Sequence, residues 1–423
     1  MESKKKLPVL FLTLLFILSL VGCGDGKLSS SDSADVILKN INNTYYEVIL
    51  DYSGTTPKNI GIQYGNVIKK TVPDYEQLVD SYLKEMVDKF FDGNMNFFFN
   101  RVKDIKQNLA QNYIDEIDGL ASVLSSTNDN ILGDGKLSVD ELFLLNLLPD
   151  VGRATQCSAV AVFGNRSDNQ QTKVGRILDW EQGSNDQLVK IQAVVTFKNG
   201  NKSICTIGYL GFMGVITGFN DDRVFAAILD SGDKSTYDSK EKRSYSFDLR
   251  EALETKTNIY DISDYMRASD KKYAYSHLIF LASSTTAIVL ENDLSKNRII
   301  RTNTSLLNSG IQWGVQNAIA CVNSFVLNGN TDNHTGSNSN SKRWNALRTM
   351  LLSQYYLNIT QLKNIITYKT GLMPGKTEDG DLYNERTQQI IIFEPYKYNL
   401  QVFFRPLNGL PSEPIFTTVN VAF

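Results

Sequence analysis

A cysteine, an arginine and an aspartate near the middle of the 423-residue chain have the types and spacing for nucleophilic chemistry. Cys157 opens an apolar, β-branched run, and Arg176 and Asp179 stand near the end of the next such run. A polar loop over residues 165–173 separates the two runs, which is the pattern of a β-hairpin with a long loop. The sequence therefore predicts that a thiol, a guanidinium and a carboxylate meet at one sheet edge.

A reactive thiol needs an activating base, and the chain has only two histidines. A cysteine–histidine dyad or a His-rich metal site is therefore a poor explanation. A cut between Gln156 and Cys157 would create an α-amine with a pKa near ~8, which could serve as base for the thiol of the same residue. Asp179 would then orient that amine, and Arg176 would stabilise the thiolate. The expected chemistry is attack on an amide carbonyl, with no cofactor.

The segments that must position this cluster change character at residue 157. Before it, apolar residues repeat with a 3.6-residue period from Tyr75 to Phe91, and further helices are predicted over 102–120 and 141–148. After it, hairpin-like pairs of short strands dominate, which favours antiparallel sheets covered by helices. The strands expected are 158–163, 188–197, 203–208, 224–229, 286–291, 298–301, 388–393 and 399–404, and the helices are 260–267, 275–283, 341–357 and 359–368.

The first 33 residues have the features of a targeting segment and a tether. Three lysines at positions 4–6 precede an apolar stretch over 7–21, which is too short for a membrane span. The stretch ends Leu-Val-Gly-Cys23, which resembles the bacterial lipobox, where the cysteine is lipidated; an ordinary cleaved signal is the alternative. We expect a signal peptide over 1–22, a tether over 23–33, and an extracytoplasmic lipoprotein anchored to the bacterial cell membrane or outer membrane.

The remaining cysteines leave two possibilities open. An extracytoplasmic compartment permits disulfides. With Cys23 lipidated and Cys157 a working thiol, only Cys205 and Cys321 could pair. Because both stand in apolar runs, two unpaired buried cysteines are the alternative.

Residues 128–141 resemble an EF-hand calcium loop. Asn130, Asp134 and Glu141 are the candidate ligands, but Leu132 stands where the second carboxylate ligand belongs. A polar loop before a helix is the alternative, and we expect no resident metal.

The composition is that of an ordinary globular protein, with 42% apolar and 21% charged residues. The formal net charge of −3 gives no reason to expect nucleic acid as a partner. The length allows two or three domains or one large one.

Cys157 together with Gly175-Arg176-x-x-Asp179-Trp180 resembles the active-site strands of the cysteine N-terminal-nucleophile hydrolases. This group includes acid ceramidase, N-acylethanolamine acid amidase, choloylglycine (bile salt) hydrolase, penicillin V acylase and the penicillin acyltransferases. Four further segments resemble the group in the same order along the chain, and the similarity extends over most of residues 57–410. These segments are 61–65, 208–222, 320–324 and 341–344.

The resemblance implies roles for three further residues. Asn220 and Asn323 would donate hydrogen bonds to the oxyanion, and Arg343 would support the site. One departure is Asp230, where the group often has Asn or Glu. The catalytic residues implied are Cys157, Arg176, Asp179, Asn220, Asn323 and Arg343, and the cleavage site implied is Gln156–Cys157.

The resemblance also implies a fold and an activity. The fold is an α+β, four-layer αββα sandwich with two antiparallel sheets, in which a helical segment (34–156) stays bound as a small subunit to a catalytic core (157–423). The activity is hydrolysis of the linear amide bond of a small N-acyl substrate through a thioester. The alternatives are acyl transfer, ester cleavage like that of the phospholipase B-like relatives, and a non-catalytic surface lipoprotein.

Overall fold

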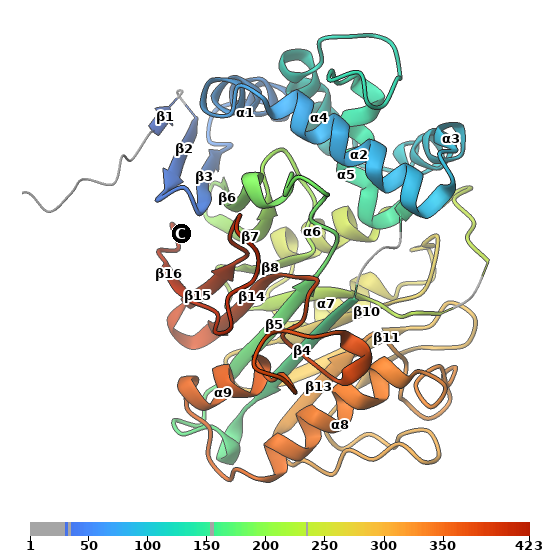
Figure 1. Cartoon of the computed structure of the whole chain (residues 1–423), viewed down its shortest axis with the longest axis vertical. Helices are drawn as coiled ribbons and strands as arrows, with labels where there is room; N and C mark the ends of the chain where they lie inside the picture. The colour runs from blue at the N-terminus through green and yellow to red at the C-terminus, as the bar shows by residue number, and fades with distance from the viewer. Residues whose placement is uncertain (1–29, 33–34, 153–155, 234–235) are drawn as a thin grey trace, which may run out of the picture.

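The computed structural model describes residues 30–32, 35–152, 156–233 and 236–423 (Figure 1). The predicted signal peptide and the lipidation site Cys23 lie outside these residues. Within the described ranges, no helix has both the length and the apolar character needed to cross a membrane.

Two sheets lie face to face in the centre of the described structure, and the strand β4 of one contacts β9 of the other. The larger sheet has the order β1-β2-β3-β6-β7-β8-β9-β10-β11-β12, and the smaller has the order β13-β4-β5-β14-β15-β16. The larger sheet consists of β1 (Ser30–Asp32), β2 (Val36–Ile41), β3 (Tyr45–Asp51), β6 (Gln192–Asn199), β7 (Lys202–Tyr209), β8 (Thr217–Asn220), β9 (Phe225–Asp230), β10 (His277–Ala282), β11 (Ala287–Asn292) and β12 (Arg298–Arg301). The smaller consists of β4 (Gln156–Val162), β5 (Lys173–Asp179), β13 (Ala318–Val322), β14 (Thr387–Glu394), β15 (Asn399–Phe404) and β16 (Thr417–Val419).

Helices cover both sheets, which gives the predicted four-layer αββα arrangement. Helices α6 and α7 pack on the larger sheet, α8 and α9 pack on the smaller sheet, and α1 to α5 lie together in the upper part of Figure 1. Of the described strand pairs, only β3 with β6 is parallel. The helices are α1 (Pro57–Thr71), α2 (Tyr75–Phe91), α3 (Met95–Lys106), α4 (Gln111–Leu124), α5 (Val139–Gly152), α6 (Tyr245–Thr255), α7 (Ile259–Met266), α8 (Asn338–Leu352) and α9 (Ile359–Ile366).

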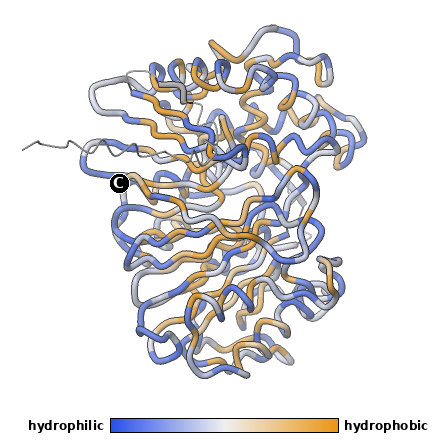
Figure 2. Tube along the Cα trace, turned by 60° about the vertical axis from the view of Figure 1, so that its left-hand side comes forward, coloured by the Kyte–Doolittle hydropathy of each residue, from blue (hydrophilic) through white to orange (hydrophobic). Residues whose placement is uncertain are grey.

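The strand β4 shows how the sequence builds these layers. Cys157, Ala159 and Ala161 belong to the core between the two sheets, whereas Val160 and Val162 belong to the core between the smaller sheet and helices α8 and α9. Successive side chains of a strand point to opposite faces, so a strand buried on both sides is apolar throughout. Figure 2 shows the same feature as hydrophobic colour along the central strands.

The sequence predicted that the N-terminal segment is helical, but the segment also contains strands. Strands β2 and β3 lie in it and pair with the core strand β6, with Tyr46 opposite Ala193. Val36 and Leu38 of β2, and Val48 and Leu50 of β3, are buried, while the residue between each pair is partly exposed, which suits strands with one face on the core. The segment therefore contributes both strands and helices to the fold.

Two predicted helices are wrong. The helix expected over 102–120 is two helices, α3 and α4, separated by a turn in which the Asn108 side chain donates to the carbonyl of Lys242. The segment 275–283 forms the strand β10, which lies between β9 and β11. A short, continuous apolar run fits a buried strand as well as a helix, and the sheet contacts decide between them.

The segment 61–65 lies inside α1 and packs closely on α4. A Cβ added at Gly61 would meet the carbonyl oxygen of Glu116 at 2.1 Å, and one added at Gly119 would meet that of Lys58 at 2.1 Å. Only glycines allow the two helices to approach so closely. This packing holds the helical layer that carries α2 and α5 above the sheets.

Candidate active site

Cys157 is buried near the start of β4, opposite Leu178 of β5. Its side chain points into the layer between the sheets. Arg176, on the same face of β5, reaches across that layer, and its Nη2 donates to the carbonyl of Ile228 in β9 at 3.0 Å. The predicted hairpin is present, and Gln156 pairs with Asp179 at its end.

Opposing influences act on the Cys157 thiol. Burial raises its pKa, whereas the Arg176 guanidinium and a hydrogen bond from the backbone N–H of Asp179 lower it, and the net pKa lies above the ordinary value. Arg176 alone therefore does not make Cys157 a thiolate. The thiol needs a base that removes its proton as it reacts.

The backbone N–H of Cys157 donates to Oδ1 of Asn323 at 2.6 Å. Asn323 follows β13, the strand that pairs with β4, and its Nδ2 donates to the carbonyl of Asp230 at 2.8 Å. An amide group carries two N–H bonds, so one remains for another acceptor. Asn323 thus holds the backbone nitrogen of Cys157 in place, and the second N–H of its side-chain amide can donate to another acceptor nearby.

Arg343 lies beneath this contact on α8 and is fully buried. Its Nη1 donates to the carbonyl of Cys157 at 2.7 Å and to Oγ of Ser158 at 2.8 Å. Its Nη2 donates to Oδ1 of Asn323 at 3.2 Å and to Oδ1 of Asn340 at 2.7 Å. The guanidinium therefore locks the start of β4 and Asn323 into one hydrogen-bonded unit.

Asp179 is buried beside this unit, and its carboxylate has its own partners. Nδ2 of Asn384 donates to it at 2.8 Å and Oγ1 of Thr387 donates at 2.9 Å. Burial raises its pKa above the ordinary value, while these hydrogen bonds and the charge of Arg343 lower it. In the uncut chain the carboxylate is thus positioned by β14 and the turn before it, while the Cys157 nitrogen bonds to Asn323.

Asn220 is not part of the site, which corrects the role implied by the sequence. Its Nδ2 donates to the carbonyls of Leu253 and Lys256 at 3.1 and 2.9 Å, so it holds the end of α6. Asn220 lies beside the start of β9, whereas Asp230, which contacts Asn323, ends that strand. At ~3.4 Å per residue, β9 separates the two positions by about 17 Å.

A polar cavity of about 630 Å³ opens beside Asn323. Gln156, Asp230, Asp233 and Asp332 contribute to its wall, together with asparagine and serine side chains of the 331–340 segment. The described lining therefore carries three carboxylates. Asp230, at the position where the sequence departs from the resembled group, lies in this wall, and its backbone carbonyl accepts the hydrogen bond from Asn323.

An apolar crevice of about 30 Å³ lies between the helical layer and the sheets. Tyr82 of α2 and Leu145 of α5 line one side, and Trp180, Tyr209 and Phe212 line the other. Trp344 does not line this crevice, because it packs against Trp313 on the outer side of the smaller sheet.

The expected cleavage site lies at the rim of the polar cavity. Gln156 begins β4, and its Oε1 accepts a hydrogen bond from Oγ1 of Thr377 at 2.8 Å. Residues 153–155, which precede it, lie outside the described part of the chain. The bond from Gln156 to Cys157 thus joins a residue facing the cavity to the buried nucleophile.

The residues of the calcium candidate make other contacts. Glu141 and Ser138 form reciprocal hydrogen bonds at the start of α5, and Asn130 donates to Asp140. The glycines of the loop donate to Asp80 of α2. Among the described residues, no group of three His, Cys, Asp or Glu is arranged to hold a metal. In the structure a loop leads into the helix α5 at Val139.

Cys205 and Cys321 are both buried and unpaired. Cys205 lies in β7 of the larger sheet and Cys321 in β13 of the smaller, where each fills the apolar core. Of the two possibilities that the sequence left open, a disulfide or two unpaired buried cysteines, the structure has the unpaired cysteines.

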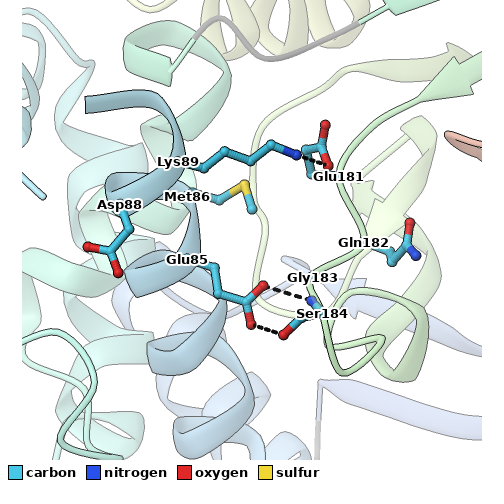
Figure 3. A pocket seen from close by; sticks show the side chains of 8 residues that line it. All are labelled: Glu85, Met86, Asp88, Lys89, Glu181, Gln182, Gly183 and Ser184. Atoms are coloured by element: carbon cyan, nitrogen blue, oxygen red, sulfur yellow. Dashed lines mark hydrogen bonds and ion pairs between the residues drawn. The ribbon is translucent and has the colours of Figure 1, made fainter. Parts of the chain in front are cut away.

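A second polar pocket, of about 580 Å³, lies between α2 and the loop after β5 (Figure 3). Glu85 accepts hydrogen bonds from the backbone N–H and Oγ of Ser184 at 2.7 and 2.6 Å. Lys89 forms an ion pair with Glu181 at 2.7 Å. These contacts attach the helical layer to the loop that follows Asp179.

Three residues that hold the site were not predicted from the sequence. Asn340 lies three positions before Arg343 on α8, a spacing that places both on one helix face and could have revealed it. Asn384 and Thr387 are about two hundred positions from Asp179 and meet it only because β14 pairs with β5. No local pattern points to them.

No family model and no curated protein matches the chain. Among solved structures it is similar to a Caenorhabditis elegans N-acylethanolamine-hydrolyzing acid amidase ortholog, with 16% identity, a TM-score of 0.43 and coverage of 59% of this chain and 100% of that chain. It is also similar to a mutant of conjugated bile acid hydrolase from Clostridium perfringens, with 11% identity, a TM-score of 0.37 and coverage of 63% of this chain and 97% of that chain. A third similar structure is penicillin V acylase from Agrobacterium tumefaciens, with 10% identity, a TM-score of 0.35 and coverage of 59% of this chain and 83% of that chain. These are the kinds of protein whose motifs the sequence resembles.

Proposed function

We propose that this protein is a cysteine amidase that cuts its own chain before Cys157 and then hydrolyses the linear amide bond of an N-acyl substrate. The observation that carries the proposal is the 2.6 Å contact between the Cys157 nitrogen and Asn323, beside a thiol faced by Arg176. A thiol and a nitrogen belong to one residue, and a polar cavity is lined by the two residues next to that nitrogen, Gln156 and Asn323.

Maturation uses the thiol against the preceding peptide bond. The sulfur attacks the carbonyl carbon of Gln156, the bond from that carbon to the Cys157 nitrogen breaks, and the nitrogen takes up a proton. This exchange frees the Cys157 α-amine, and water then hydrolyses the resulting thioester, which frees the Gln156 carboxylate and restores the Cys157 thiol. Arg343, bonded to the Cys157 carbonyl, holds the backbone in place during this exchange.

The same groups then act on the substrate. The α-amine accepts the thiol proton, the sulfur attacks the acyl carbonyl, and the departing amine takes the proton from the α-amine. The second amide hydrogen of Asn323 supports the oxyanion, a contribution of about 3 kcal/mol in comparable sites. Water resolves the thioester and restores the thiol. A thiol pKa above its usual value suits this order, because the proton leaves only when the base takes it.

The two cavities suit the two halves of such a substrate. The apolar crevice beside Trp180 would take the acyl group, and the polar cavity beside Asn323 would take the amine. Three carboxylates in the described wall of that cavity favour an amine that is polar or positively charged.

The site of action that we propose follows from the N-terminal sequence. A lipid on Cys23 would anchor the protein at the outer side of a bacterial cell membrane or at the outer membrane. The polar stretch after Cys23 would serve as the tether.

Hydrolysis assays test the proposed activity. Purified wild type is mixed with a panel of N-acyl amides, and the acids and amines released are measured; hydroxylamine added during turnover traps the thioester as a hydroxamate. We expect release and trapping with wild type, neither with Cys157→Ala, and both with the matched control Cys205→Ala, whose thiol lies in the larger sheet. Wild type that releases no acid from any member of the panel, although it is cut before Cys157, would contradict the amidase assignment.

A further inference from the structure

Tyr209 is a buried tyrosine that the reaction described so far does not use. It ends β7, opposite Gln192 of β6, and it lines the apolar crevice with Tyr82 and Trp180. Its side chain is nine-tenths buried, with 6% of the residue exposed. Among the described residues, its hydroxyl has no hydrogen-bond partner.

The neighbouring tyrosines differ in this respect. Oη of Tyr82 accepts a hydrogen bond from Nε1 of Trp180 at 2.6 Å, Oη of Tyr64 accepts from the backbone N–H of Gly211 at 3.1 Å, and Oη of Tyr75 donates to the carbonyl of Leu210 at 2.9 Å. Buried hydroxyls without a partner are rare because burial removes their bonds to water. The unused hydroxyl of Tyr209 therefore requires an explanation that packing does not give.

The position of Tyr209 points to the substrate. Its phenol is close enough to Arg176 and Cys157 to interact with both electrostatically. It lines the crevice together with side chains that are mostly apolar. Burial raises the pKa of Tyr209 above its usual value, so the phenol keeps its proton and can donate it in a hydrogen bond.

We propose that the Tyr209 hydroxyl donates a hydrogen bond to an oxygen substituent on the acyl group of the substrate, close to the scissile carbonyl. The inference rests on the proposed amidase function and names its substrate class. The preferred substrates are amides of short acids that carry a hydroxyl, oxo or ether oxygen on the second or third carbon.

The size of the crevice sets the length of the acyl group. A volume of about 30 Å³ has room for roughly two water-sized groups. A short acyl chain fits, whereas a long one would displace Leu145 or Phe212. A site that holds a buried polar group for its substrate discriminates strongly against an analogue that leaves the group unpaired.

A comparison of two substrates with wild type and Tyr209→Phe tests the proposal. The substrates are the coumarin amides of glycolate and propionate, which each place two non-hydrogen atoms beyond the carbonyl, and kcat/KM is measured for each. We expect wild type to prefer the hydroxylated amide by about tenfold or more. We expect Tyr209→Phe to reduce the preference to within about twofold, through loss on the hydroxylated substrate alone.

Thermal unfolding separates this role from a structural one. Tyr209→Phe removes an unpaired hydroxyl, so its Tm should be equal to or higher than that of wild type. The matched control Tyr64→Phe removes a hydroxyl that pairs with Gly211, so its Tm should fall while its preference between the two substrates stays as in wild type.

The outcomes distinguish this inference from the proposed function. Wild type that hydrolyses both amides equally well would overturn the role of Tyr209 without any variant. Equal losses on both substrates in Tyr209→Phe, or no loss, would overturn it too, and the amidase function would stand. Wild type that hydrolyses no acyl amide at all would overturn the proposed function and the inference with it.

Discussion

The backbone nitrogen of Cys157 lies 2.6 Å from Oδ1 of Asn323. In the uncut chain this nitrogen belongs to a peptide bond, and a cut after Gln156 would turn it into an α-amine. An amine that donates one N–H to Asn323 keeps its lone pair for the thiol proton. Arg343 contacts the same oxygen at 3.2 Å, so the base, the carbonyl of the nucleophilic residue and the oxyanion donor belong to one network.

The first prediction compares Asn323 with Asn220, the two asparagines that the resemblance implied as oxyanion donors. Asn323→Ala removes the acceptor for the Cys157 nitrogen and the donor for the oxyanion. We expect kcat to fall by about 10²–10³-fold, as for loss of one oxyanion donor in other enzymes. The measurement is kcat with a substrate that wild type hydrolyses, together with the rate of chain cleavage.

Asn220→Ala provides the matched comparison. It leaves the carbonyls at the end of α6 without their donor, so we expect a loss of stability of about 1–3 kcal/mol and an unchanged kcat. Equal kcat losses in the two variants would contradict the assignment of the site to the Asp230 end of β9.

Much of the site could be predicted because β4 and β5 are neighbours in the sequence. A hairpin brings Cys157, Arg176 and Asp179 together from local pattern alone. The error at Asn220 arose because a motif fixes the order of residues but not the end of the strand at which each lies. Asn384 and Thr387 depend on the pairing of β14 with β5, which no local pattern encodes. The strand β10 was predicted as a helix because five of its six residues are apolar and both of its faces are buried.

The second prediction concerns pH and His277. Burial lowers the pKa of His277 to about 3, and its Nδ1 and Nε2 lie 3.3 and 3.0 Å from the Tyr275 carbonyl and the Asn292 amide, as a neutral imidazole requires. The unfolded chain takes up this proton near pH ~6.5, so the folded state binds fewer protons below that pH. The contribution of His277 to stability should therefore fall as the pH falls from about 6.5 toward 3, by up to about 1.4 kcal/mol per pH unit. Burial raises the pKa of Glu141 and Asp150 to about 7, and these groups act with the opposite sign, so the variant is needed to isolate His277.

Urea unfolding at pH 7, 6 and 5 measures this dependence. In His277→Gln the slope below pH 6.5 should be smaller by about 1.4 kcal/mol per pH unit. A slope remains, because burial also lowers the pKa of His334, to about 4. An unchanged slope in His277→Gln would show that His277 is not held neutral.

The third prediction concerns the attachment of the helical layer after cleavage. Glu85 accepts two hydrogen bonds from Ser184, and Lys89 pairs with Glu181 (Figure 3). Glu85→Ala leaves the Ser184 N–H without its acceptor at the loop that follows Asp179. We expect the two fragments of the cut protein to separate at a lower urea concentration, as measured by gel filtration.

Lys84→Ala is the control on the same helix. Lys84 pairs with Asp88 four residues later, so this exposed ion pair stays within α2 and contributes little. The control should separate at the same urea concentration as wild type. If Glu85→Ala behaves like the control, the contacts of Glu85 do not hold the fragments together.

The intact mass and N-terminal sequence of the purified protein show whether Cys157 becomes the first residue of a chain. We expect wild type to yield a fragment of residues 157–423 that begins with Cys157 and carries a free α-amine, and Cys157→Ala to remain a single uncut chain. Wild type that hydrolyses acyl amides while its chain stays uncut, or is cut at another bond, would contradict the claim that one residue supplies both the nucleophile and its base.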